Sequence, residues 1–280
     1  MSPNSLGIAL ALVSSVTTAI AHAMLKSGKD KLAIRGMIGA TGTLIALPAC
    51  FFVPLPTAEL WPWLGLASAL HTTYQLALNR SYSMNGFAVA YPWARGIAPP
   101  IVALLSFVFL GEHIGMINLI GVATISAGLL LMVGFKSVPW AGLLAASVTG
   151  LLTALYTVVD ARGIRLAPEA MTFVVWFFLF DGLIMFPIFL LRRRGKVLAL
   201  LAAEGRQGII AGLVSLVCFG TALIALRLAP VPVVAALRET SVVFAMIIAS
   251  VAFKEEIGPR RTIGALLSCL GAILVIYRPI

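Results

Sequence analysis

Two arginines stand inside long apolar stretches of the chain, where charged side chains are rare. Arg95 lies in the segment AYPWARGIAPP and Arg238 in the segment LRETS. A charge inside a bilayer is costly, so it normally faces a water-filled cavity or an oppositely charged partner. Because a guanidinium offers a planar set of N–H donors to carboxylates and phosphates, both arginines are candidates for binding an anionic group. The alternative for Arg95 is a structural ion pair with Asp181 or Glu239.

Further polar and aromatic side chains accompany the arginines. His71, Tyr74 and Gln75 of the segment HTTYQLAL are three and four residues apart and share one helix face. They indicate a polar cavity wall, although a single intramembrane histidine also occurs as a packing residue. Tyr91 shares a face with Arg95, whereas Trp93 points elsewhere. The candidate substrate-binding residues are His71, Tyr74, Gln75, Tyr91, Trp93, Arg95, Trp176 and Arg238.

Prolines and acids in the same stretches suggest moving parts. Pro92, Pro99 and Pro100 lack an amide donor, which predicts a kink or an interruption of their helix. Pro99 and Pro100 are the predicted hinge between inward-open and outward-open states. Asp181 and Glu239 are the candidates for ion coupling, and a structural salt bridge is the alternative for Asp181.

The elements that must position these residues follow from composition. The chain is 61% hydrophobic and 11% charged, unlike a soluble domain. A helix needs about 20 apolar residues to cross a bilayer. Stretches of this kind cover residues 5–25, 33–54, 60–79, 87–110, 115–135, 139–159, 170–191, 208–229, 231–253 and 260–278. We therefore predict an all-α polytopic membrane protein with ten transmembrane helices.

Several classes of function find no support in the sequence. It has no zinc-ligand spacing, phosphate-binding glycine loop or nucleophile elbow, so we predict no enzymatic activity, no metal and no cofactor. The net charge of +10 resides mostly on basic residues at the ends of the apolar stretches. That placement indicates contact with membrane lipids and argues against nucleic acid.

The two halves of the chain repeat at an offset of 143 residues. This offset relates Arg95 to Arg238, Glu112 to Glu255, Gly121 to Gly264 and Gly128 to Gly271. Each half holds five apolar stretches, and an odd number gives duplicated halves opposite orientations in the membrane. The pattern predicts two inverted five-helix repeats, residues 1–136 and 137–280. Such repeats typify secondary transporters, which bind substrate near the midplane.

The segments IAPPIVALLSFVFLGEHIGMINLIGVATISAGLLLM and ALRETSVVFAMIIASVAFKEEIGPRRTIGALLSCLGAIL resemble the two EamA-type repeats of the drug/metabolite transporter superfamily. The resemblance implies ten helices, a central cavity between the halves and alternating access. Members export amino acids, metabolites and drugs, or exchange nucleotide sugars and phosphorylated sugars. The coupling acid of the small four-helix relatives has no counterpart in the first stretch, where only His22 is available. The expectation is therefore transport that does not depend on a proton gradient.

The function that these observations favour is secondary export of small metabolites, above all amino acids and including aromatic ones. Two midplane arginines suit a carboxylate, and the histidine and aromatic residues suit an apolar body. The alternatives are exchange of nucleotide sugars or sugar phosphates, and unselective drug efflux. The predicted partners are the small-molecule substrate and lipids, and the protein is expected to be a monomer in the bacterial inner membrane.

Charge predicts the orientation. Fourteen basic residues lie on the side of the loops that join spans 1–2, 3–4, 5–6, 7–8 and 9–10, and four lie on the other side. Since positive loops resist translocation, the first side should be cytoplasmic and both termini should face outside. Single cysteines labelled on intact cells with an impermeant maleimide test this: position 194 should be protected and the termini should react. Strong labelling at 194 with protected termini would reverse the assignment.

Overall fold

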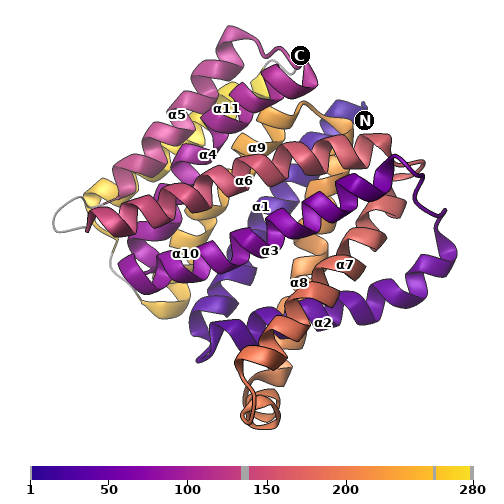
Figure 1. Ribbon diagram of the computed structural model, residues 1–280. Coiled ribbons are helices and arrows are strands. Elements are labelled where there is room, and N and C mark those ends of the chain that lie inside the picture. Colours follow the sequence, from indigo (N-terminus) through magenta and orange to yellow (C-terminus); the bar gives the residue numbers. More distant parts are fainter. Residues whose placement is uncertain (1, 134–138, 255–256, 278–280) are drawn as a thin grey trace.

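The computed structural model describes residues 2–133, 139–254 and 257–277. Within these ranges eleven α-helices and one short 3₁₀ turn follow one another (Figure 1). They are α1 (Pro3–Ser27), α2 (Lys31–Ala49), η1 (Cys50–Phe52), α3 (Leu60–Asn85), α4 (Phe87–Leu110), α5 (Met116–Met132), α6 (Trp140–Leu166), α7 (Ala170–Arg192), α8 (Val197–Leu228), α9 (Val231–Glu239), α10 (Ser241–Phe253) and α11 (Pro259–Tyr277). Glu255, which the sequence pairs with Glu112, lies outside the described residues.

The prediction of ten membrane-spanning helices is confirmed. Eight segments of the described chain are long and apolar enough to cross a membrane, and α9 and α10 together form one of them. The ninth span is α5, a shorter apolar helix of 17 residues. The tenth is α3, which has 26 residues but a lower hydropathy because it carries His71, Thr72, Thr73 and Gln75. Most of its polar residues are buried against other helices, so lipid does not meet them.

The helix boundaries have local causes. Asp30 caps α2 by accepting hydrogen bonds from the amides of Leu32 and Ala33, each at 3.0 Å. Gly86, with φ of 68°, separates α3 from α4, and Gly111, with φ of 66°, ends α4. These positive φ angles favour glycine because other residues would bring Cβ against the backbone.

Spans four and nine differ from what the sequence predicts for them. The prolines were expected to kink or interrupt span four; no interruption occurs, because α4 is one helix that contains Pro92, Pro99 and Pro100. The interruption occurs in span nine, at Thr240 between α9 and α10. There the Thr240 hydroxyl donates to the Leu237 carbonyl at 2.6 Å and also lies 2.8 Å from Ser15 Oγ. A threonine side chain can thus replace backbone pairing at a break in a buried helix.

The two halves pack in a symmetric pattern. Helices α1 and α4 of the first half pack on α8 and α6 of the second. In the corresponding contacts, α6 of the second half packs on α3 of the first, and α9 and α10 pack on α1. The helices α2 and α7 pack on each other, as do α5 and α11, which form one flank of the molecule (Figure 1). Gly39 and Gly182 meet at the α2–α7 crossing, where a Cβ on Gly39 would lie 3.1 Å from Gly182 Cα. This pairing supports the division into residues 1–136 and 137–280, which we retain as a proposal.

The repeat glycines are the contact points between α5 and α11. A Cβ on Gly121 would lie 2.8 Å from the Gly271 carbonyl oxygen, and a Cβ on Gly271 would lie 2.7 Å from the Gly121 oxygen. Gly128 and Gly264 oppose each other in the same way, at 2.6 and 2.5 Å. The glycines that reveal the repeat therefore allow the backbones of its two last helices to touch.

Gly128→Ala should destabilise the protein by about 1–3 kcal/mol, because the new methyl group meets backbone that must move. Gly65→Ala in α3 is the matched control, since nothing lies within 4 Å of its added Cβ. It should be neutral or stabilising by roughly 0.5–1 kcal/mol. Thermal unfolding in detergent, followed by size-exclusion chromatography, measures both. Equal unfolding temperatures would show that the α5–α11 contact contributes little.

Candidate functional site

Polar side chains from several helices meet at two adjoining cavities in the centre of the bundle. Each cavity has a volume of about 30 Å³, room for roughly one or two water molecules in this conformation. They share a wall formed by Arg35, Ile38, Tyr74, Ser215 and Phe219, so the two cavities lie next to each other. Arg35 comes from α2, Tyr74 from α3, and Ser215 and Phe219 from α8. The space therefore lies between helices of both halves, as expected for a cavity at a repeat interface.

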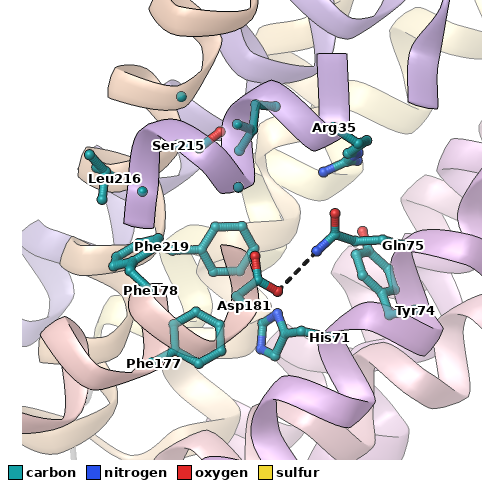
Figure 2. A pocket seen from close by; sticks show the side chains of 14 residues that line it. Arg35, His71, Tyr74, Gln75, Phe177, Phe178, Asp181, Ser215, Leu216 and Phe219 are labelled. Atoms are coloured by element: carbon teal, nitrogen blue, oxygen red, sulfur yellow. Dashed lines mark hydrogen bonds between the residues drawn. The ribbon is translucent and has the colours of Figure 1, made fainter. Parts of the chain in front are cut away.

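The first cavity combines an acid with aromatic rings (Figure 2). Gln75 donates its amide N–H to Asp181 Oδ1 at 3.2 Å, and both side chains face the cavity. His71 lies beside them on α3 (Figure 2). The apolar wall consists of Phe177, Phe178, Leu216 and Phe219. The predicted site residues His71, Tyr74 and Gln75 all line this cavity.

The second cavity contains the buried cations. It is lined by His22, Arg95 and Arg238, together with Arg35 from the shared wall. The guanidinium of Arg238 lies over the Phe219 ring at 5.4 Å from its centre, and the residue is 4% exposed. Neither Arg238 nor Arg35 has an ion pair with any described residue, and their Nε atoms are buried without a hydrogen-bond partner in that part of the chain. The Glu239 and Asp181 carboxylates act on Arg238 and Arg35 through space. A guanidinium without a direct ion pair in a membrane interior is costly, so an anionic guest would be favourable here.

Arg95 differs from Arg238 because its charge is compensated. Its Nη1 donates to both carboxylate oxygens of Glu239 at 3.2 Å, and the two side chains are 5% and 4% exposed. The pair joins α4 of the first half to α9 of the second. The Tyr91 ring lies 5.3 Å from the Arg95 guanidinium, and the Tyr91 hydroxyl is 3.1 Å from Ser241 Oγ. The structural alternative for Arg95 is thus observed, although Arg95 also contributes to the cavity wall.

Three predicted site residues lie away from both cavities. Tyr91 packs between Arg95 and His22, with its ring centre 4.7 Å from that of His22. Trp93 donates its indole N–H to Ser147 Oγ on α6 at 2.9 Å. Trp176 contacts Trp61 and Phe180. The positions of Trp93 and Trp176 along their own helices do not reveal these contacts, because the contacting residues belong to other helices.

Two residues of the site were missed by the sequence interpretation. Arg35 is one of the fourteen basic residues that the charge count assigns to the side of the cytoplasmic loops. In the structure it lies in the second turn of α2 and lines both cavities. Asp160 follows directly after the predicted span 139–159, whereas α6 continues to Leu166. Asp160 Oδ2 is 2.8 Å from His71 Nε2, and both side chains are 3% exposed. The absence of proline between residue 140 and Pro168 was the available signal for the longer helix.

Ion pairs tie the helices together beyond one end of the cavities. Arg165 donates to Glu112 Oε1 at 2.6 Å and to the carbonyls of Leu226 and Ala229 at 3.0 and 3.2 Å. Glu112 also accepts the amide of Val231 at 2.8 Å. Glu112, just after the end of α4, therefore links α6 to the α8–α9 junction.

A second group of ion-paired residues joins the helices at the opposite end of the bundle. Arg193 Nε donates to Asp30 Oδ2 at 2.6 Å, and the Asp30 amide donates to Glu204 at 2.8 Å. Partial burial opposes ionisation of Asp30, but the hydrogen bonds from Arg193 and from the Ala33 and Leu32 amides outweigh it. The net result is a lowered pKa for the Asp30 carboxyl. The Asp30–Arg193 ion pair is therefore charged at neutral pH and weakens when acid protonates Asp30.

Together, the apolar helices and the polar cavities define a polytopic membrane protein with a polar interior. The model of the EamA-like transporter family matches residues 140–277, so the second part of the chain is similar to an EamA-like transporter domain. Proteins of this family are membrane transporters of small molecules rather than enzymes. No curated protein sequence matches the chain significantly. A solved crystal structure matches the fold with a TM-score of 0.72 and 19% identity, over 98% of this chain and 97% of that one.

Arg95→Met should destabilise the fold strongly, by about 3–5 kcal/mol, because it leaves Glu239 as a buried uncompensated acid. The double variant Arg95→Met, Glu239→Gln removes both charges and should recover most of that loss. Unfolding temperature in detergent measures both variants. A stable single variant would mean that water or another cation compensates Glu239, and that Arg95 is available to a substrate.

Proposed function

We propose that the protein is a secondary exporter of small zwitterionic metabolites, above all amino acids including aromatic ones. The observation that carries this proposal is Arg238, which is buried in the cavity wall without an acidic partner among the described residues. A substrate carboxylate beside it would relieve the cost of burial and form charge-assisted hydrogen bonds. Arg35, on the shared wall, provides a second cation for the same carboxylate.

The remainder of the cavity suits the other parts of an amino acid. Asp181 offers a carboxylate to an ammonium group, and Gln75 already holds its orientation. Phe177, Phe178 and Phe219 offer apolar rings to a side chain. Positive and negative groups on different walls favour a zwitterion over either a simple amine or a simple acid.

Alternating access between the two halves would carry the substrate across. Each of the four ion pairs among the described residues, Arg95–Glu239 included, joins one half to the other, so rocking would require some of these pairs to break and form again. Pro99 and Pro100 remain our proposed hinge in α4, and the break at Thr240 offers the second half a comparable point of bending. Asp181 and Glu239 remain proposed contributors to coupling, with Glu239 held by Arg95 in the conformation described.

The alternatives make different demands on the same cavity. A nucleotide sugar or sugar phosphate carries at least one phosphate, which Arg35 and Arg238 would attract and Asp181 would repel. Unselective drug efflux would use the phenylalanine wall and require no arginine. We further propose location in the bacterial inner membrane with both termini outside, and a monomeric state.

Arg238→Ala should lower transport of labelled phenylalanine by about tenfold to a hundredfold, which corresponds to the roughly 1.5–3 kcal/mol of a charged hydrogen bond. Counterflow in proteoliposomes, without any ion gradient, measures it. Phenylethylamine, which lacks the carboxylate, should lose little. Arg238→Lys should recover part of the loss, since lysine keeps the charge but not the planar fork.

Arg162→Ala is the matched control, because this exposed cation on α6 lies outside both cavities. It should transport phenylalanine normally. If Arg238→Ala transports phenylalanine normally as well, or if the amine and the amino acid suffer alike, the arginine has a structural role and selective carboxylate recognition is wrong.

A further inference from the structure

Two of the four ion pairs that join the halves, among the described residues, are shielded from water. These are Arg95–Glu239 and His71–Asp160 at the centre of the bundle, where each of the four side chains is at most 5% exposed. Breaking either pair would leave a buried acid without its partner in a membrane interior, which is strongly unfavourable. We therefore expect the central pairs to persist while the halves move.

The other two pairs lie at opposite ends of the bundle, and water reaches both. The side chains of Arg165 and Glu112 are 31% and 16% exposed, and those of Arg193 and Asp30 are 36% and 19% exposed. In a pair of this kind water can replace the partner of each charge, so breaking the pair costs little. The difference in exposure separates the pairs that can open during transport from the pairs that can act as a pivot.

A repeated sequence motif joins two helices of the second half at the end that holds Glu112. The end of α6 carries IRLAP at residues 164–168, and the end of α8 carries LRLAP at residues 226–230. Arg165 and Arg227 each donate to the carbonyls one residue before and two residues after the arginine of the other motif, over 3.0–3.2 Å. Each arginine thus pairs with carbonyls at the C-terminal end of the other helix, where a cation is favourable. The exchange holds α6 and α8 together as one unit.

Glu112 connects this unit to the first half. Its Oε1 accepts a hydrogen bond from Arg165 Nη1 at 2.6 Å, and its Oε2 accepts one from the amide of Val231, the first residue of α9, at 2.8 Å. Arg165 uses Nε and Nη2 for the carbonyls at the end of α8, so Nη1 alone makes the bond that crosses to the first half. That bond can break while the α6–α8 unit stays intact. Its loss also weakens the hold on the start of α9, the helix that carries Arg238.

Asp30 has the corresponding position at the opposite end. Arg193 donates Nε to Asp30 Oδ2 at 2.6 Å and Nη2 to Oδ1 at 3.3 Å, and the Asp30 amide donates to Glu204 Oε1 at 2.8 Å. Asp30 lies between α1 and α2 of the first half, whereas Arg193 and Glu204 belong to the second. At each end, therefore, one acidic residue of the first half binds an arginine and a further group of the second half.

We propose that the pairs Glu112–Arg165 and Asp30–Arg193 are the two gates of the transport path, that they open one at a time, and that the halves pivot about the central pairs. The inference rests on the alternating access of the proposed function and not on the identity of the substrate. Both gates are formed in the structure, and each central cavity has a volume of only about 30 Å³. The conformation described is then the occluded state, and a substrate enters after one gate opens and the cavity widens.

Cys218 provides a reporter for the opening of either gate, because it lines the second cavity and is 2% exposed. Replacing the other two cysteines, Cys50 and Cys269, by serine leaves it as the single thiol. An impermeant methanethiosulfonate reagent added to right-side-out or inside-out membrane vesicles tests each side of the membrane separately. Glu112→Gln should speed modification from one side and Asp30→Asn from the opposite side. The expected factor is about fivefold, which is equivalent to about 1 kcal/mol for a water-accessible ion pair.

Glu169→Gln is the matched control. Glu169 is an exposed acid just beyond α6, near the same end as Glu112, and takes part in none of the four ion pairs. Its variant should leave the modification rate unchanged from both sides. The double variant Glu112→Gln, Asp30→Asn should react faster from both sides. Where a neutral variant does not reach the membrane, Glu112→Asp and Asp30→Glu keep the charge, change the reach and should show the same side preference to a smaller extent.

The outcomes separate this proposal from the proposed substrate. If the two single variants speed modification from the same side, or each speeds it equally from both sides, the pairs are general stabilising contacts and the assignment of gates is wrong. Unchanged rates in both variants would overturn it as well. No substrate enters this measurement, so phenylalanine counterflow by the wild type with unchanged Cys218 rates would refute the gates and leave the proposed function standing. Side-specific opening without counterflow of any amino acid would support the gates and refute the substrate.

Discussion

The Arg95–Glu239 ion pair is the interaction on which the arrangement of the site depends. Neither group can remain alone in a membrane interior, so α4 and α9 must approach closely enough to join them. Adjacent residues on a helix point about 100° apart, and Arg238 acts on the Glu239 carboxylate only through space, without an ion pair among the described residues. Pairing Arg95 with Glu239 therefore leaves Arg238 facing the cavity. The requirement for one internal ion pair thus leaves a second, repeat-related arginine for another role.

Close backbone contact keeps the two halves in register around this pair. The α5–α11 crossing uses Gly121 against Gly271 and Gly128 against Gly264, and the α2–α7 crossing uses Gly39 against Gly182. At these points the absence of a side chain, rather than burial of a large one, permits the contact, since lipid offers no hydrophobic drive for helix association. The α5–α11 crossing lies on one flank of the molecule (Figure 1), whereas Gly39 of the α2–α7 crossing lines the first of the two central cavities.

The charges around these cavities are distributed unevenly. Asp181 and His71 line the first cavity, whereas Arg238 lines the second, and Phe219 lines both. Arg35 borders both. A guest with separated opposite charges fits this polarity better than a guest with a single charge, and this asymmetry underlies the proposed substrate class. The ion pairs Glu112–Arg165 and Asp30–Arg193 hold the loops at the two ends of the bundle. These pairs would have to break for one half to move relative to the other.

The sequence by itself determined the fold class, the ten spans, the repeat offset and the family, because a bilayer restricts the chain to apolar helices of a narrow range of lengths. It also identified His71, Tyr74, Gln75 and Arg238 as polar residues within spans. The tertiary structure alone decided which charges pair. The predicted site omitted Asp160, because the predicted span ended one residue before it. It omitted Arg35, because that residue is close to a basic loop. It included Trp93 and Trp176, although these side chains contact other helices. Periodicity describes only the faces of one helix, whereas the partner of a buried charge lies on another helix, at a distance that packing sets.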